Sequence, residues 1–159
     1  MNSLWKQTLA LWYFGFTKIP LILFVRPKIN VLDQEQCILT IPLRRRTKNH
    51  LNSLYFGALA VGADLACGLL AMHIISNSKR SISLVFKDVQ ADFLKRVDSD
   101  AVFSCVEGQE ILTLIQNVIE SGERQHKTLK IQVTSPEKYG DEVMATFSLT
   151  LSLKEKSKK

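Results

Sequence analysis

The sequence predicts an α+β domain with a mostly antiparallel sheet. One apolar run, residues 54–75, has the length of a long helix. Runs in which apolar and polar residues alternate stand before and after it, as in half-buried strands. One amphipathic helix interrupts the later strands. The order is therefore one helix, two strands, one long helix and a run of strands with an inserted helix, which is typical of this class.

Length and composition indicate one soluble globular domain. The chain has 159 residues, of which 46% are hydrophobic and 23% charged. Its formal net charge is +6. Two explanations of this excess stay open. It comes either from the lysine-rich tail KEKSKK, or from contact with an anionic partner such as nucleic acid, coenzyme A phosphates or a membrane surface.

The cysteines predict neither a disulfide framework nor a metal site. Cys37, Cys67 and Cys105 are far apart, odd in number and outside any C-x-x-C pattern. Small buried side chains in a reducing compartment explain them best. We therefore expect a cytoplasmic protein with no metal.

The N-terminal segment predicts an amphipathic helix over residues 3–16 that ends near Pro20. Lys6 before an apolar run resembles the start of a signal peptide, but Lys18 interrupts the run and no small-x-small cleavage site follows. We expect this helix to pack on the domain or on a partner subunit, with membrane association as the alternative. The expected division of the chain is an N-terminal helix and linker over 1–26, a main domain over 27–154 and a basic tail over 155–159.

Period-two patterns predict the strands. In residues 36–43 (QCILTIPL) alternate positions are apolar, and Pro42 belongs at a strand end or sheet edge because it lacks an N–H. In residues 81–96 the apolar face changes parity, which predicts a bulge near 87–89. The other strands are expected over residues 28–32, 101–107, 129–133 and 143–153.

Between the strands, residues 109–121 predict an amphipathic helix. Their apolar residues recur at i, i+3, i+4, i+7 and i+8, and Gly122 stands where a helix ends. Two polar segments predict loops: RRRTKNH, residues 44–50, and SPEKYGDE in the last hairpin.

The apolar run 54–75 must be buried either in lipid or in protein. Its many small residues suit both environments. Asp64 near its middle favours protein, because a mid-bilayer acid costs about 2.5–3.5 kcal/mol on insertion scales. The apolar faces of the strands also need a large apolar body to cover. We therefore expect a central helix wrapped by a curved sheet, and no stable membrane insertion.

The segment NHLNSLYFGALAVGADLACG resembles the loop and central helix of hotdog-fold acyl-CoA thioesterases. It is most similar to a poorly characterised branch with Asn-His, a few residues, and then a helix ending in acid-Leu-Ala-x-Gly. The resemblance covers roughly residues 28–153. It implies a hotdog fold: a curved, mostly antiparallel sheet around a long central helix, here with an added N-terminal helix and one inserted helix.

The resemblance also implies an activity. Hotdog thioesterases hydrolyse an acyl-CoA or acyl-carrier-protein thioester with an acid on the central helix, which acts as general base or nucleophile. Backbone N–H groups at the start of that helix polarise the thioester carbonyl. The substrate carries the coenzyme A, so no resident cofactor is expected. Sites in this fold form between subunits, which implies a homodimer or a dimer of dimers.

In a gapless match, Asp64 falls at the catalytic acid. The family's His-Gly-Gly is replaced by Tyr55-Phe56-Gly57, and a shift by one residue would move the acid position to Leu65. A buried structural acid and ligand binding without turnover stay open as alternatives for Asp64. Asn49, His50 and Asn52 precede the helix and either cap it or orient water and thioester; with Tyr55, Phe56 and Gly57 they complete the candidate catalytic and substrate-binding set.

Basic residues are candidates for the coenzyme A phosphates. Arg44, Arg45 and Arg46 form the densest positive cluster, and Lys79 and Arg80 open the strand after the central helix. Solvated loops are the alternative. Nucleic-acid binding is not expected, because no aromatic stacking face accompanies the basic residues. Two other functions stay open: a non-catalytic acyl-binding or interaction protein on the same fold, and a membrane-associated protein.

Overall fold

The computed structural model describes residues 3–156, so the last residues of the expected basic tail, 157–159, lie outside it. Five helices and six strands make up this part of the chain. In order they are α1 (Ser3–Thr17), α2 (Pro20–Val25), β1 (Lys28–Leu32), β2 (Cys37–Ile41), α3 (Phe56–Asn77), β3 (Ile82–Phe93), β4 (Ala101–Cys105), α4 (Gly108–Ser121), β5 (Gln125–Thr134), α5 (Pro136–Tyr139) and β6 (Val143–Glu155).

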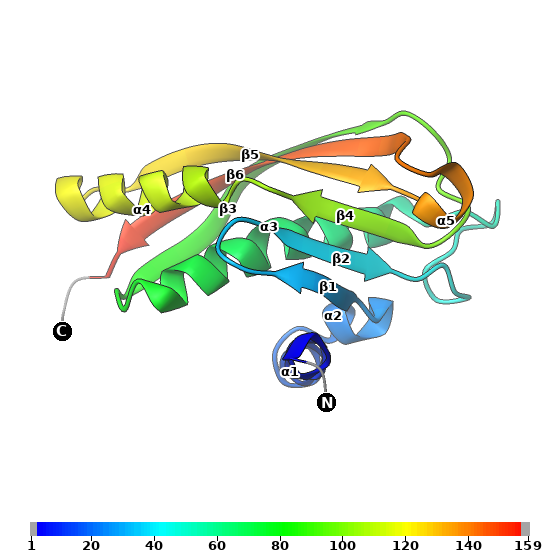
Figure 1. Ribbon diagram of the computed structural model, residues 1–159, viewed down its shortest axis with the longest axis horizontal. Helices are drawn as coiled ribbons and strands as arrows, with labels where there is room; N and C mark the ends of the chain where they lie inside the picture. The colour runs from blue at the N-terminus through cyan, green and yellow to red at the C-terminus, as the bar shows by residue number, and fades with distance from the viewer. Residues whose placement is uncertain (1–2, 157–159) are drawn as a thin grey trace.

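The strands form one antiparallel sheet in the spatial order β1-β2-β4-β5-β6-β3. The sheet curves over α3, which runs beneath it (Figure 1). α3 packs on β1, β2, β4, β5 and β6, and α4 packs on α3, β5 and β6. The predicted α+β class and the central helix wrapped by a curved sheet are confirmed.

The small residues of α3 let the sheet approach it closely. Gly62 shows this best: a Cβ atom there would lie 2.3 Å from the ring of Phe103 in β4. Ala63, Ala66 and Cys67 are also fully buried. α3 is long and apolar enough to cross a membrane by length and composition, yet more than half of its most apolar stretch is buried inside the domain. The apolar run is thus the core of the fold.

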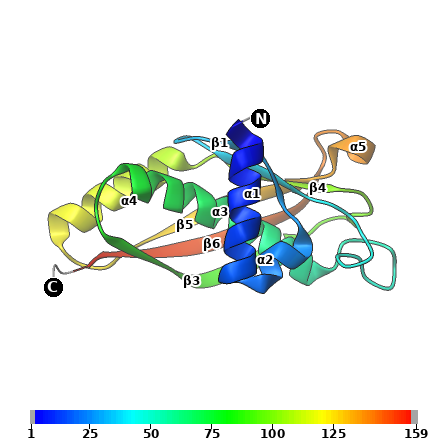
Figure 2. The ribbon, with the colours of Figure 1, turned by 90° about the horizontal axis from the view of Figure 1, so that it is seen from below.

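The N-terminal helices lie across the domain, beside β1 (Figure 2). Thr8 Oγ1 of α1 accepts a hydrogen bond from the N–H of Ile29 in β1 at 3.1 Å, and Trp12 Nε1 donates to the carbonyl of Pro27 at 2.7 Å. The predicted helix over 3–16 is present. The linker expected after it is instead a second helix, because Pro20, which ends α1, also suits the first position of α2.

β3 is an edge strand with twelve residues. Its register with β6 shifts between Phe86 and Asp88, which confirms the bulge predicted near 87–89. Its apolar side chains Val85, Val89 and Phe93 are at least half exposed. A long edge with exposed apolar residues is a ready template for pairing with another strand.

Candidate functional site

The structure distributes the predicted site residues over three hollows and one distant end of the molecule. A pocket at the start of α3 has a volume of about 400 Å³. A cavity beside Asp64 has a volume of about 570 Å³. A third hollow, of about 810 Å³, lies beside Arg44, Arg45 and Arg46 in the loop after β2. We call them the α3-start pocket, the Asp64 cavity and the arginine hollow.

The α3-start pocket brings together four of the predicted residues. It is lined by Asn49, His50, Tyr55 and Phe56, together with Phe93 at the end of β3 and residues 95–97 just after it. Within residues 3–156, no acceptor takes the N–H of Phe56 or Gly57, the first two residues of α3. A helix N-terminus of this kind offers hydrogen-bond donors and positive dipole character to an anion. The pocket therefore holds donors suited to a developing oxyanion.

The loop before α3 is held by its own side chains. Asn49 Oδ1 accepts the N–H groups of Leu51 at 2.9 Å and Ser53 at 3.2 Å. The Asn49 carboxamide oxygen thus stabilises the conformation of the loop. Asn52, with φ 59°, is exposed, does not line the pocket and accepts a hydrogen bond from Lys48 Nζ at 3.0 Å. The structure does not bring Asn52 together with the other predicted residues, whereas His50 is exposed at the pocket.

The Tyr55 side chain covers part of the start of α3. Its ring packs against Gly57, where a Cβ atom would lie 2.6 Å from the Tyr55 ring. The rings of Tyr55 and Phe56 are 4.9 Å apart between centroids, and both side chains are more than half exposed. Two exposed aromatic rings therefore flank the free N–H groups, at the position where the resemblance implies a histidine and a glycine.

Asp64 lies in a different environment. It is partly buried, and of the sixteen residues that line its cavity only Asp64 and Gln7 have polar side chains. Desolvation by burial raises the pKa of the Asp64 carboxyl above its ordinary value of 3.8. A carboxylate in apolar surroundings with a raised pKa is a better proton acceptor than an exposed one. Sequence reasoning missed Gln7, because a glutamine in an N-terminal amphipathic helix has no distinguishing pattern.

Asp64 does not lie at the start of its own helix. From Phe56 to Asp64 is eight positions, or about 12 Å along the helix axis. Asp64 is not among the residues of the α3-start pocket, and Phe56 is not among those of the Asp64 cavity. The acid and the free N–H donors of one chain thus belong to separate hollows.

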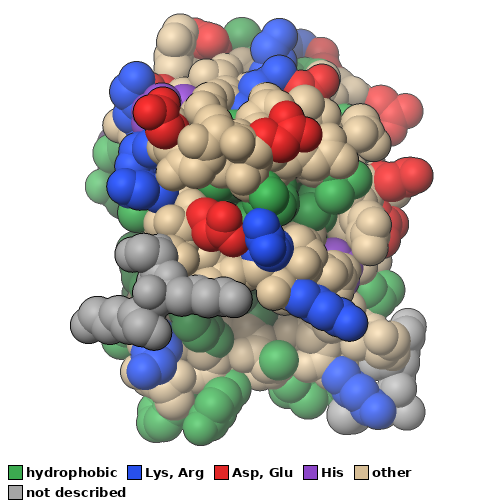
Figure 3. Space-filling model, turned by 90° about the vertical axis from the view of Figure 1, so that its left-hand side faces the viewer, with side chains coloured by type: hydrophobic (Ala, Val, Ile, Leu, Met, Phe, Trp, Pro, Cys, Tyr) green, Lys and Arg blue, Asp and Glu red, His purple; other side chains and the backbone are tan. Residues whose placement is uncertain are grey.

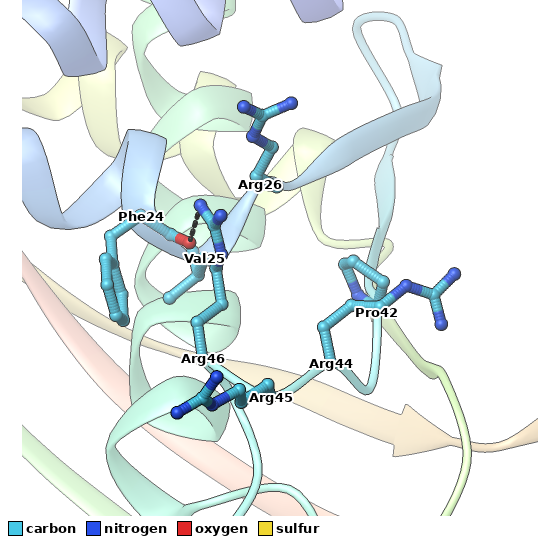
Figure 4. Close-up of a pocket in the computed structure, with 7 residues that line it drawn as sticks. All are labelled: Phe24, Val25, Arg26, Pro42, Arg44, Arg45 and Arg46. Atoms are coloured by element: carbon cyan, nitrogen blue, oxygen red, sulfur yellow. Dashed lines mark hydrogen bonds between the residues drawn. The ribbon is translucent and has the colours of Figure 1, made fainter.

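The arginine hollow is formed by the end of α2 and the loop after β2 (Figure 4). It contains the predicted Arg44, Arg45 and Arg46 and also Arg26, which sequence reasoning missed because it stands alone between an apolar helix and Pro27. The four guanidinium groups point in different directions. The hollow is strongly positive and open, and its arginines do not converge on one point.

Three of these arginines contact neighbouring groups. Arg46 donates to the carbonyl of Phe24 at 3.4 Å and lies 5.5 Å from the centre of its ring. Arg26 lies 5.2 Å from the ring of Trp12. Arg44 approaches Asp100 at 3.9 Å, with the Arg44 side chain 68% exposed. An exposed ion pair of this length contributes little to stability, so this guanidinium is accessible to a ligand.

Lys79 and Arg80 lie at the opposite end of α3, about 33 Å from its start at the helical rise. Arg80 Nε pairs with Glu155 Oε1 at 3.1 Å. Figure 3 faces this end of the molecule and shows basic and acidic side chains intermingled, with hydrophobic side chains toward the lower edge. Within one chain, Lys79 and Arg80 cannot share a phosphate with Arg44–Arg46.

The cysteines and the metal-ligand types form no site in residues 3–156. All three thiols are free and buried, and burial raises the pKa of the Cys37 thiol to about 12. No group of three or more His, Cys, Asp and Glu side chains in the described chain could hold a metal ion.

Comparison with known protein families gives a match over most of the chain. A family model described as "Domain of unknown function (DUF4442)" matches residues 8–152. No curated protein matches the chain.

Several solved structures have the same fold. A Pseudomonas aeruginosa protein of unknown function, described as a "probable thioesterase", matches with a TM-score of 0.77 at 22% identity, over 94% of this chain and 96% of that one. A Chlorobaculum tepidum protein of unknown function matches with a TM-score of 0.81 at 15% identity, over 96% and 97% of the two chains. A Haemophilus influenzae thioesterase matches with a TM-score of 0.67 at 15% identity, over 99% and 94%. These matches confirm the hotdog fold of this chain.

Proposed function

We propose a thioesterase function for this chain, which belongs to the DUF4442 family of domains of unknown function. The substrate class is an acyl thioester of coenzyme A or of acyl-carrier protein, and no resident cofactor takes part. One observation carries the proposal: a single chain holds an acid beside an apolar cavity and free N–H donors in a second pocket, at the two ends of the same edge strand. Two of the structurally similar proteins bear thioesterase descriptions, which supports the same reaction class.

The edge strand β3 connects the two hollows. Residues 84–86, at its beginning, line the Asp64 cavity, and Phe93, at its end, lines the α3-start pocket. We propose that β3 pairs antiparallel with β3 of a second copy about a two-fold axis near Val89, as its exposed apolar edge favours. Val85 would then lie opposite the partner's Phe93, since the two positions are equally distant from Val89.

In this homodimer each site is composite. The Asp64 cavity of one chain lies beside the α3-start pocket of its partner, so two identical sites arise. Each has an acid with a raised pKa, an apolar cavity for the acyl group and free backbone donors at a helix N-terminus. Arg44, Arg45 and Arg46 shortly precede the α3-start pocket in the chain, which supports them as ligands of the coenzyme A phosphates.

The chemistry of the proposed site is hydrolysis by an activated water. Asp64 takes a proton from water as the water oxygen attacks the thioester carbonyl carbon. The carbonyl oxygen becomes an anion, which accepts hydrogen bonds from the N–H groups of the partner's Phe56 and the partner's Gly57. The carbon–sulfur bond of the tetrahedral intermediate then breaks, and Asp64 returns the proton to the thiolate. The products are a carboxylic acid and a free thiol.

A second candidate function is acyl-thioester binding without turnover. The Tyr55 ring against Gly57 favours it, because this ring stands beside the N–H groups that a thioester carbonyl would have to reach. Tight binding of acyl-CoA together with no thiol release would support this function. A Tyr55→Ala change that creates turnover would show that the ring is what blocks it.

The test is a thiol-release assay with butyryl-, octanoyl-, lauroyl- and palmitoyl-CoA. We expect hydrolysis by the wild type and a fall of about 10²–10⁴-fold in Asp64→Asn, the usual contribution of a general base. Asp141→Asn, at an exposed acid outside all three hollows, is the matched control. Unchanged hydrolysis by Asp64→Asn removes Asp64 from the mechanism, and no hydrolysis of any of the four acyl-CoAs by the wild type removes the acyl-CoA thioesterase function.

A further inference from the structure

The Asp64 cavity lies between the N-terminal helices and the main domain. Its inner wall is α3 and the beginning of β3, and its outer wall is α1 and α2. The α3 residues that line it, from Asp64 through Gly68 to Met72, recur on one face of the helix. This face extends over eight positions, about 12 Å at the helical rise.

The exposure of the lining residues gives the cavity a floor and a mouth. Leu11, Ile22, Ile29 and Leu65 are at most 5% exposed and form the floor. Ile19, Met72 and Val85 are 45–51% exposed and stand at the mouth. The mouth therefore opens beside β3, the strand that pairs with the second copy in the proposed dimer.

The cavity differs from an ordinary packing defect in its polar content. Gln7 Oε1 is buried without a hydrogen-bond partner, the one such side-chain atom within residues 3–156. A buried unpaired acceptor costs stability, and protein interiors rarely retain one. An apolar hollow of several hundred cubic ångströms with two polar side chains has the character of a ligand site.

We propose that this cavity binds an unbranched, medium-length acyl chain, with α1 and α2 as the wall that sets the accepted chain length. The inference rests on the proposed function for the identity of the ligand. The α3 face that lines the cavity is about 12 Å long, which matches the length of an extended octanoyl-to-lauroyl group. Each buried methylene strengthens binding by about fourfold. Affinity therefore rises with chain length until the cavity is full and then levels off.

Two neighbouring residues of α1 supply the test. Ala10 lines the cavity, whereas Leu9 does not, and both side chains are exposed enough to accept a larger group without disturbing the core. Ala10→Phe fills the cavity, and Leu9→Phe places the same ring on the outer face of the same helix. Met72→Trp fills the mouth from α3, so the result does not depend on one helix.

The experiment measures binding of the four acyl-CoAs by calorimetry, with each change combined with Asp64→Asn to prevent turnover. We expect affinity to level off at octanoyl or lauroyl in the parent, and at a shorter chain in Ala10→Phe and Met72→Trp. Lauroyl-CoA should bind at least tenfold more weakly to both, while Leu9→Phe matches the parent. Chain-length profiles that are identical in Ala10→Phe and Leu9→Phe, or an affinity independent of chain length, would overturn the inference.

The same data separate this inference from the proposed function. Chain-length-dependent binding that Ala10→Phe shortens, together with no thiol release by the wild type, keeps the acyl cavity and removes the thioesterase. Hydrolysis by the wild type with a chain-length preference that Ala10→Phe leaves unchanged keeps the thioesterase and removes the cavity as its acyl site.

Discussion

The α3-start pocket and the Asp64 cavity differ in what each provides for catalysis. The pocket has free N–H donors, an exposed histidine and a polar loop, and the only predicted acid lies elsewhere. The cavity has an acid with a raised pKa and apolar walls, and its polar side chains are Asp64 and Gln7. Each hollow thus has what the other lacks, which supports the proposal that they are two halves of one site.

The N–H donors and Asp64 lie in separate hollows because each requires a different environment. An oxyanion needs unpaired N–H groups, which α3 offers only in its first turn. An acid acquires a raised pKa in apolar surroundings, which α3 provides further along, where α1 and α2 cover it. The N–H donors and the acid are therefore about 12 Å apart along the axis of α3. The proposed two-fold axis through β3 would bring the acid of one chain to the donors of its partner without distorting α3.

The largest effect is expected from breaking the proposed pairing of β3. Val89→Lys would place like charges opposite each other at the proposed two-fold axis, where the apolar Val89 side chain is 63% exposed. We expect a monomer by light scattering and thioesterase activity at background, although both hollows of each chain stay intact. Gln132→Lys, on an exposed position of the interior strand β5, should remain dimeric and active. An active monomer of Val89→Lys would show that one chain suffices.

The next effect concerns the donors in the α3-start pocket. Phe56→Pro removes one N–H and keeps the helix, because proline suits the first helical position and Tyr55 already has the extended backbone that precedes proline. We expect kcat to fall by about 10²–10³-fold, as for the loss of one oxyanion donor. Phe56→Ala loses the same ring and retains the N–H, so it should keep most of its activity. Equal losses in the two variants would assign the effect to the ring.

A smaller effect is expected on stability as a function of pH. Burial raises the pKa of Asp64 in the folded protein above its ordinary 3.8, so the folded state holds this proton over a pH range where the unfolded state has released it. The free energy of unfolding should therefore fall as pH rises from 3.8 through the raised pKa. Urea unfolding of wild type and Asp64→Asn across this range should show the decline in the wild type only. The acid limb of kcat/KM should also lie above pH 3.8.

Much of the fold could be predicted because burial imposes periodicity. The central helix, the bulge in β3 and the stripe of α4 each follow from apolar spacing. α2 was missed because Pro20 was interpreted only as the end of α1. β5 begins at Gln125, before its predicted start, because residues 126–128 are polar and exposed and show no apolar alternation. α5 is one turn within the polar segment of the last hairpin, too short for a periodic signal.

The site was harder to predict than the fold. Asp64 was chosen as a candidate because an acid in an apolar run is conspicuous, and His50 because it precedes the helix, and both roles stay predictions. Asn52 is kept out of the α3-start pocket by the conformation of its own loop. The Asp64 cavity and the positions of Gln7 and Arg26 depend on where α1 and α2 lie. That position follows from tertiary contacts such as Thr8 with Ile29, which no local pattern contains.

The most direct measurement is the activity of a heterodimer that contains one Asp64→Asn chain and one Phe56→Pro chain, purified through two different affinity tags. In composite sites both changes fall in one site and the other site is unaltered, because Asp64 and Phe56 of one chain serve different sites. We therefore expect half of the wild-type activity from the heterodimer, although each homodimer is nearly inactive. If the heterodimer is as inactive as its parents, acid and donors act within one chain and the site does not span the β3 interface.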